Sequence, residues 1–199
     1  FSYRGAWSSA GTFSFANALE DVRSAIGYVR KDSSVAAFRS DPGHVILIGH
    51  SMGGWLTLMQ AAADSSIECA AALDFWNVGD DGQQMQHDRA VDSSETAYNT
   101  WVTAPGGPIH ANGKALSAEM KRHAETWNPI RLAPALAGHS LLVISTNAND
   151  SHQKLVAGLR AAGARRVTAL QWNTDHSFSD RRIQLARTMV DWLQERCSR

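Results

Sequence analysis

The stretch 44–54 constrains the fold of this chain most, because it joins a short apolar run to a serine flanked by glycines. The apolar run predicts a fully buried strand, and the apolar pattern after Ser51 predicts a helix. Between them lies Gly49-His50-Ser51-Met52-Gly53. Glycine permits strained backbone angles and lets a strand and a helix approach closely. The stretch therefore predicts a strand, a sharp turn and a helix, with the Ser51 hydroxyl standing free at the turn.

The rest of the chain alternates between patterns typical of strands and of helices. Predicted helices cover 15–29, the residues after Ser51 as far as 63, the region around 155–159, and 183–197; predicted strands cover 67–75, 141–144 and 167–172. Such alternation predicts an α/β fold with a mostly parallel sheet and helices on both faces. The polar interval at about 77–127 contains one expected helix, at 116–125, and is predicted to be an excursion or small cap. Residues 1–3 are expected to end a strand.

Size and composition fit one soluble α/β domain spanning residues 1–199, with 44% hydrophobic residues available for a core. Nineteen basic residues balance nineteen acidic ones without forming a basic stripe, so we expect no nucleic-acid partner. No apolar run reaches the roughly 18 residues of a membrane span. Localisation stays open between the cytoplasm and a secreted or periplasmic site.

The two cysteines, Cys69 and Cys197, can pair or stay free, and we expect two structural thiols. No cluster of Cys and His residues has the spacing of metal ligands. We therefore expect no metal and no cofactor.

The strand, the Gly-x-Ser-x-Gly turn and the helix resemble the nucleophile elbow of the α/β-hydrolase family, especially its esterase and prolyl-oligopeptidase-like members. The resemblance implies that Ser51 is a nucleophile and that the family's acid and histidine follow it in that order. The backbone N–H of Met52 would stabilise the oxyanion of an attacked acyl group, because it opens the helix. The alternative role for Ser51 is to cap that helix.

For the base we select His176, in the loop between the last predicted strand and the last predicted helix. Parallel strands end at the same edge of a sheet, so this loop is expected to open beside Ser51. The alternative is an exposed loop histidine without a catalytic role. His50 is expected to pack or hydrogen-bond locally.

For the acid we select Asp150, which follows the strand before it and precedes a helix. Helix N-capping is the common alternative use of such an aspartate. Asp74, at the end of the preceding strand, is a rival because some lipases use that position, whereas Asp175 is too close in sequence to the base. The loop before Asp150 carries Thr146 and Asn147 where the family usually has a glycine.

The resemblance covers nearly the whole chain but only the second half of the family's fold, so the sequence is expected to represent an N-terminally truncated member. The family's second oxyanion donor lies in the absent part; the loop 105–110 offers N–H groups but is more typical of a turn. The predicted activity is cleavage of a small-molecule carboxylic ester through an acyl-Ser51 intermediate. Peptide or acyl-peptide cleavage and a non-catalytic binding role are the alternatives.

The elbow strand is expected to expose a long apolar edge, because the family places it inside the sheet beside strands that this sequence lacks. An uncovered edge of that kind recruits another chain. The sequence therefore predicts a homo-oligomer or a covering amino-terminal segment.

Overall fold

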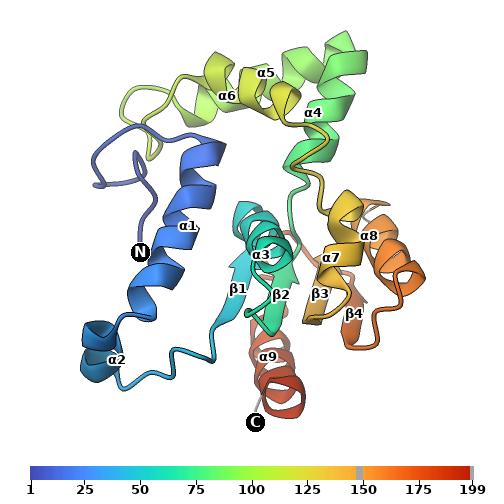
Figure 1. Cartoon of the computed structure of the whole chain (residues 1–199). Helices are drawn as coiled ribbons and strands as arrows, with labels where there is room; N and C mark the ends of the chain where they lie inside the picture. Colours follow the sequence, from blue (N-terminus) through green and yellow to red (C-terminus); the bar gives the residue numbers. More distant parts are fainter. Residues whose placement is uncertain (147–149, 198–199) are drawn as a thin grey trace. The chain divides into compact units, whose positions relative to one another are not determined.

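The computed structural model describes residues 1–146 and 150–197 (Figure 1). The chain divides into two compact units. The first comprises Phe1–Ser40 and Asn77–Asn128, and the second comprises Asp41–Trp76 and Pro129–Arg199. Organisation as a single domain stays a prediction.

The second unit contains a sheet of parallel strands in the order β1 (Ile46–His50), β2 (Cys69–Leu73), β3 (Ser140–Thr146) and β4 (Val167–Trp172). β2 and β3 are buried along their whole length, because they lie between other strands and are covered on both faces. The four carboxyl ends meet at one edge of the sheet. The loops that follow the strands are thereby brought to the same edge, where the site described below lies.

Helices cover both faces of this sheet, as the sequence predicts (Figure 1). On one face α3 (Met52–Ala63) contacts β1 and β2, and it adjoins the 3-10 helix η1 (Pro129–Leu132) and α7 (Ala133–Leu136). These two in turn contact α8 (Asp150–Ala161). On the other face α9 (Arg182–Arg196) packs on the sheet through Trp192, Leu185, Met189 and Leu193. The predicted α/β fold class is confirmed.

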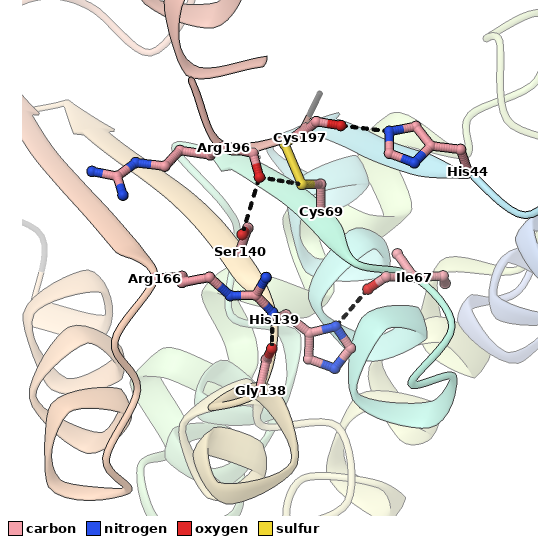
Figure 2. The surroundings of a disulfide bond; sticks show 9 residues. All are labelled: His44, Ile67, Cys69, Gly138, His139, Ser140, Arg166, Arg196 and Cys197. Carbon is pink, nitrogen blue, oxygen red and sulfur yellow. Dashed lines mark hydrogen bonds between the residues drawn. A yellow bond between two sulfur atoms is a disulfide. The ribbon is translucent and has the colours of Figure 1, made fainter. Parts of the chain in front are cut away.

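A disulfide joins Cys69 at the start of β2 to Cys197 just after α9, with the two Cα atoms 6.0 Å apart (Figure 2). The expectation of two free thiols was wrong. The partners are separated by 128 positions in sequence, so only the packing of α9 on the sheet brings them together. The His44 ring hydrogen-bonds with the carbonyl oxygen of Cys197 at 2.5 Å, which holds Cys197 beside the segment that leads into β1 (Figure 2).

The first unit is helical: α1 (Phe15–Val29), α2 (Asp32–Phe38), α4 (Val78–His87), α5 (Arg89–Val102) and α6 (Gly113–Arg122). The prediction of one helix in the interval 77–127 was too low, since α4, α5 and α6 all lie there. These helices contact one another partly through polar and small residues. The buried Asn99 amide donates to the Ser117 hydroxyl at 3.0 Å, for example. α4 and α5 are poor in apolar residues, so the sequence pattern did not single them out.

Residues 1–3 form no strand in the described structure, contrary to the prediction. The nearest extended pairing is a single antiparallel bridge between Ala6 and Ile109. Two further bonds hold the loop 105–110: His110 N–H donates to the Gly5 oxygen at 2.7 Å, and Trp7 N–H donates to the Pro108 oxygen at 2.6 Å. This loop is thus part of the framework of the first unit.

Candidate active site

Ser51 occupies the sharp turn between β1 and α3, with φ 56° and ψ −121°. Such angles cost a non-glycine residue about 1–3 kcal/mol, so surrounding contacts must hold them. The Ser51 N–H donates to the Leu73 oxygen at 2.9 Å, and the Ser51 oxygen accepts from Trp76 N–H at 3.1 Å. Both contacts come from the end of β2 and the loop after it. The strained turn expected from the glycine-flanked pattern is present.

Two glycines allow the strand and helix to meet at this turn. A Cβ atom on Gly49 would lie 2.0 Å from the backbone oxygen of Gly53, and one on Gly54 would lie 2.8 Å from Cβ of Phe75. Neither distance is compatible with a side chain. Gly53, by contrast, has nothing within 4 Å of the added atom.

The Ser51 side chain makes no capping hydrogen bond with α3. The structure therefore does not support the capping alternative for this residue. Met52 is the first residue of α3, and N–H groups of a helix's first turn have no acceptor within the helix. Together with the helix dipole, these groups favour an anionic oxygen beside Ser51.

The structure pairs His176 with Asp74, whose Oδ2 lies 2.5 Å from His176 Nδ1. Asp74 directly follows β2, and His176 lies in the loop after β4, so the parallel topology brings both to the carboxyl edge of the sheet. The Asp74 side chain is 7% exposed, whereas that of His176 is 54% exposed. A buried carboxylate thus orients an imidazole that remains accessible.

The structure pairs His176 with Asp74, the rival, and not with Asp150, the acid predicted from the sequence. The Asp150 side chain is 76% exposed at the start of α8, and its carboxylate pairs with Lys154 Nζ at 2.5 Å. This is an interaction between neighbouring helical turns. Part of the loop before Asp150, including Asn147, lies outside the described residues. The signal for Asp74 was its place directly after a fully apolar strand, where a carboxylate is buried and needs partners.

Hydrogen bonds keep the buried Asp74 ionised. Burial raises the pKa of Asp74, but donation from the Thr146 hydroxyl at 2.6 Å, from Thr146 N–H at 2.9 Å and from His176 outweighs it. The net effect holds the pKa of this carboxyl below its usual value. Asp74 is therefore a carboxylate at neutral pH, as the orientation of a histidine base requires.

His50 supports the loop that carries His176. Its Nε2 lies 2.7 Å from the His176 backbone oxygen, and the two rings are tilted by 41° with centroids 4.5 Å apart. Phe178, buried at the end of the same loop, contacts the rings of His50 and Trp172 at 6.0 and 5.9 Å. His50 thus packs and hydrogen-bonds, as expected, but with a loop 126 positions away in sequence.

Over residues 1–146 and 150–197, no group of three or more His, Cys, Asp and Glu side chains is arranged to hold a metal ion. Nor does any helix within that part of the chain combine the length and the apolar character needed to cross a bilayer.

The profile of the Alpha/beta hydrolase family matches residues 1–188. Among solved structures, the enol-lactonase from Burkholderia xenovorans LB400 aligns with a TM-score of 0.60 at 15% identity, over 97% of this chain and 79% of the lactonase. E-2-(acetamidomethylene)succinate hydrolase aligns with a TM-score of 0.58 at 14% identity, over 96% of this chain and 79% of that hydrolase. The alpha/beta hydrolase GrgF from Penicillium sp. sh18 aligns with a TM-score of 0.56 at 16% identity, over 98% of this chain and 78% of GrgF. At these identities the likeness is one of fold. A sequence search of curated proteins finds no match.

Proposed function

The chain belongs to the α/β-hydrolase family, and from that premise we propose that it is a serine hydrolase cleaving carboxylic esters through an acyl-Ser51 intermediate. One observation carries the proposal: the strained Ser51 and the His176–Asp74 pair lie at the same edge of the parallel sheet. A serine hydroxyl becomes a nucleophile at neutral pH when an imidazole acts as its base and a carboxylate orients that imidazole. These residue types at this edge supply both.

The proposed mechanism assigns each proton to an atom. His176 Nδ1 donates to Asp74, so Nε2 is the nitrogen that accepts the proton of Ser51 as Oγ attacks the ester carbon. The negative oxygen of the tetrahedral intermediate accepts from Met52 N–H. Collapse breaks the bond to the alcohol, which leaves with the proton from Nε2. Water then attacks the acyl-enzyme by the same route and releases the carboxylic acid. Asp74 stabilises the imidazolium and takes no proton itself.

An ester is the favoured substrate because its alkoxide is a better leaving group than an amine, so it demands least from the oxyanion donors. Peptide or acyl-peptide cleavage uses the same residues and is the runner-up. Comparing p-nitrophenyl acetate with a peptide p-nitroanilide separates the two. Turnover of the anilide at a similar rate would favour the peptidase.

We further propose that β1 is covered by a second copy of the chain. In the described residues β1 pairs with β2 alone, and Ile48 in β1 is 46% exposed. An uncovered strand edge with apolar side chains favours pairing with another chain. Light scattering at micromolar concentration tests this, because an active species of 21.6 kDa would be a monomer and would overturn it.

The decisive experiment is labelling with a fluorophosphonate probe, followed by mapping of the modified residue by mass spectrometry. We expect a single adduct on Ser51, and we expect Ser51→Ala to lose both the adduct and p-nitrophenyl ester hydrolysis while unfolding at the wild-type temperature. Ser65→Ala, at an exposed serine after α3, is the matched control and should behave as wild type. A wild-type protein that is folded but unlabelled would favour the non-catalytic binding role.

A further inference from the structure

A second histidine faces the other oxygen of Asp74. His152 lies in the first turn of α8, and its side chain is 3% exposed. Its Nδ1 is 4.0 Å from Asp74 Oδ1, whereas His176 contacts Oδ2. Asp74 is thus held between two imidazoles, only one of which is accessible.

The hydrogen bond made by His152 defines its tautomer. The Phe75 N–H donates to His152 Nε2 at 3.1 Å, so Nε2 carries a lone pair and the proton of the neutral ring is on Nδ1. This Nδ1 lies 4.0 Å from Asp74 Oδ1, beyond a hydrogen bond but well within electrostatic reach. Burial lowers the pKa of His152 to about 4, against the attraction of Asp74. At neutral pH the ring is therefore neutral and Nε2 remains an acceptor.

This bond holds a strained segment. Asp74 has φ 40°, which is unfavourable for a residue with a side chain and needs support from its neighbours. On one side, the Asp74 N–H donates to the Ile144 oxygen at 2.6 Å. On the other, the peptide that links Asp74 to the buried Phe75 is held by His152. The Phe75 ring also meets the His152 ring edge-on, with centroids 4.4 Å apart.

We propose that His152 is a positioning residue for the candidate triad: by holding the Phe75 N–H, it fixes the backbone of Asp74 and thereby the carboxylate that orients His176. Its kinetic consequence rests on the proposed hydrolase function, whereas its effect on the tautomer of His176 does not. His152 touches no reacting atom in this account. It acts through Asp74 alone.

Three variants test the proposal. His152→Leu removes the acceptor for Phe75 N–H, and His152→Gln retains a side-chain oxygen near the position of Nε2. His139→Leu is the matched control, because His139 is also buried and its ring also bonds a backbone group, the Ile67 oxygen (Figure 2). It lies just before β3, at the end of the strand opposite to the site. If His152→Leu does not fold, His152→Asn replaces it, since its shorter side chain falls short of the Phe75 N–H.

Two readouts are needed. Long-range proton–nitrogen NMR spectra report which ring nitrogen of each histidine carries the proton, without requiring any activity. We expect Nδ1–H for both His152 and His176 in the wild type, and a mixture of tautomers for His176 in Asp74→Asn. His152→Leu should give the same mixture, whereas His152→Gln and His139→Leu should keep the wild-type form of His176. An Nε2–H tautomer of His152 in the wild type would overturn the inference.

The second readout is the rate at which the fluorophosphonate probe labels Ser51. His152→Leu should lower it about ten-fold, the effect of losing one buried hydrogen bond, with His152→Gln closer to the wild type. In an Asp74→Asn background His152→Leu should add little, because it acts through that carboxylate. Equal losses in both backgrounds, or an unchanged rate and tautomer in folded His152→Leu, would refute positioning. Tautomers that respond as expected in a protein whose Ser51 is never labelled would support positioning while refuting the proposed hydrolase.

Discussion

Removing the disulfide should destabilise the protein strongly. The size of this loss follows from the length of the loop that the bond closes. The bond between Cys69 and Cys197 closes a loop with a sequence separation of 128. In the chain-entropy account, a loop of that length removes about 17 cal/mol/K from the unfolded chain, or about 5 kcal/mol at 25 °C. In a chain of this size, that corresponds to a fall in Tm of about 10–20 °C.

The perturbation is Cys69→Ala with Cys197→Ala. Alanine is preferred to serine because both positions are buried, and a hydroxyl there would need a hydrogen-bond partner. Scanning calorimetry would be run on the wild type and the double variant, each with and without a phosphine reductant. The reduced wild type should approach the double variant, and the reductant should leave the double variant unchanged. A wild type that mass spectrometry shows to be reduced, but whose Tm is unaltered, would refute the reasoning.

Three further predictions follow from the site. Asp74→Asn should lower kcat for p-nitrophenyl ester by about 10³–10⁴, because the amide no longer stabilises the imidazolium, whereas Asp150→Asn should change it less than two-fold; the reverse order would restore Asp150 as the acid. Gly49→Ala should destabilise the fold by about 3 kcal/mol or more in urea titrations, because its Cβ would lie 2.0 Å from a backbone oxygen, with Gly53→Ala as the tolerated comparison. His152 has a pKa lowered from 6.5 to about 4, so the folded state binds fewer protons than the unfolded chain and stability should fall as the pH drops from 6.5 towards 4, by about 3 kcal/mol. A His152→Gln variant with the same pH slope over that window would contradict the assignment.

The sequence by itself determined those turns, strands and helices whose conformation depends on residues adjacent in the chain. The turn at Ser51 follows from glycines that permit a close approach of β1 and α3, and β4 and α9 follow from apolar periodicity. The parallel topology then placed His176 at the carboxyl edge, because all strands of such a sheet end on the same side. These features need only steric limits and the periods of strand and helix, so they can be read before any tertiary contact is known.

Tertiary structure alone decided which distant side chains meet. Asp74 and Asp150 both follow predicted strands, and local sequence does not say which of them pairs with His176. The pairing with Asp74 depends on the positive φ of that residue and on the Thr146 hydroxyl and N–H, which donate to the Asp74 carboxylate. The pairing of Cys69 with Cys197 likewise required α9 to lie on the sheet. A hydrogen bond or disulfide between residues far apart in sequence depends on distances of a few ångströms, which the whole fold sets and no local pattern encodes.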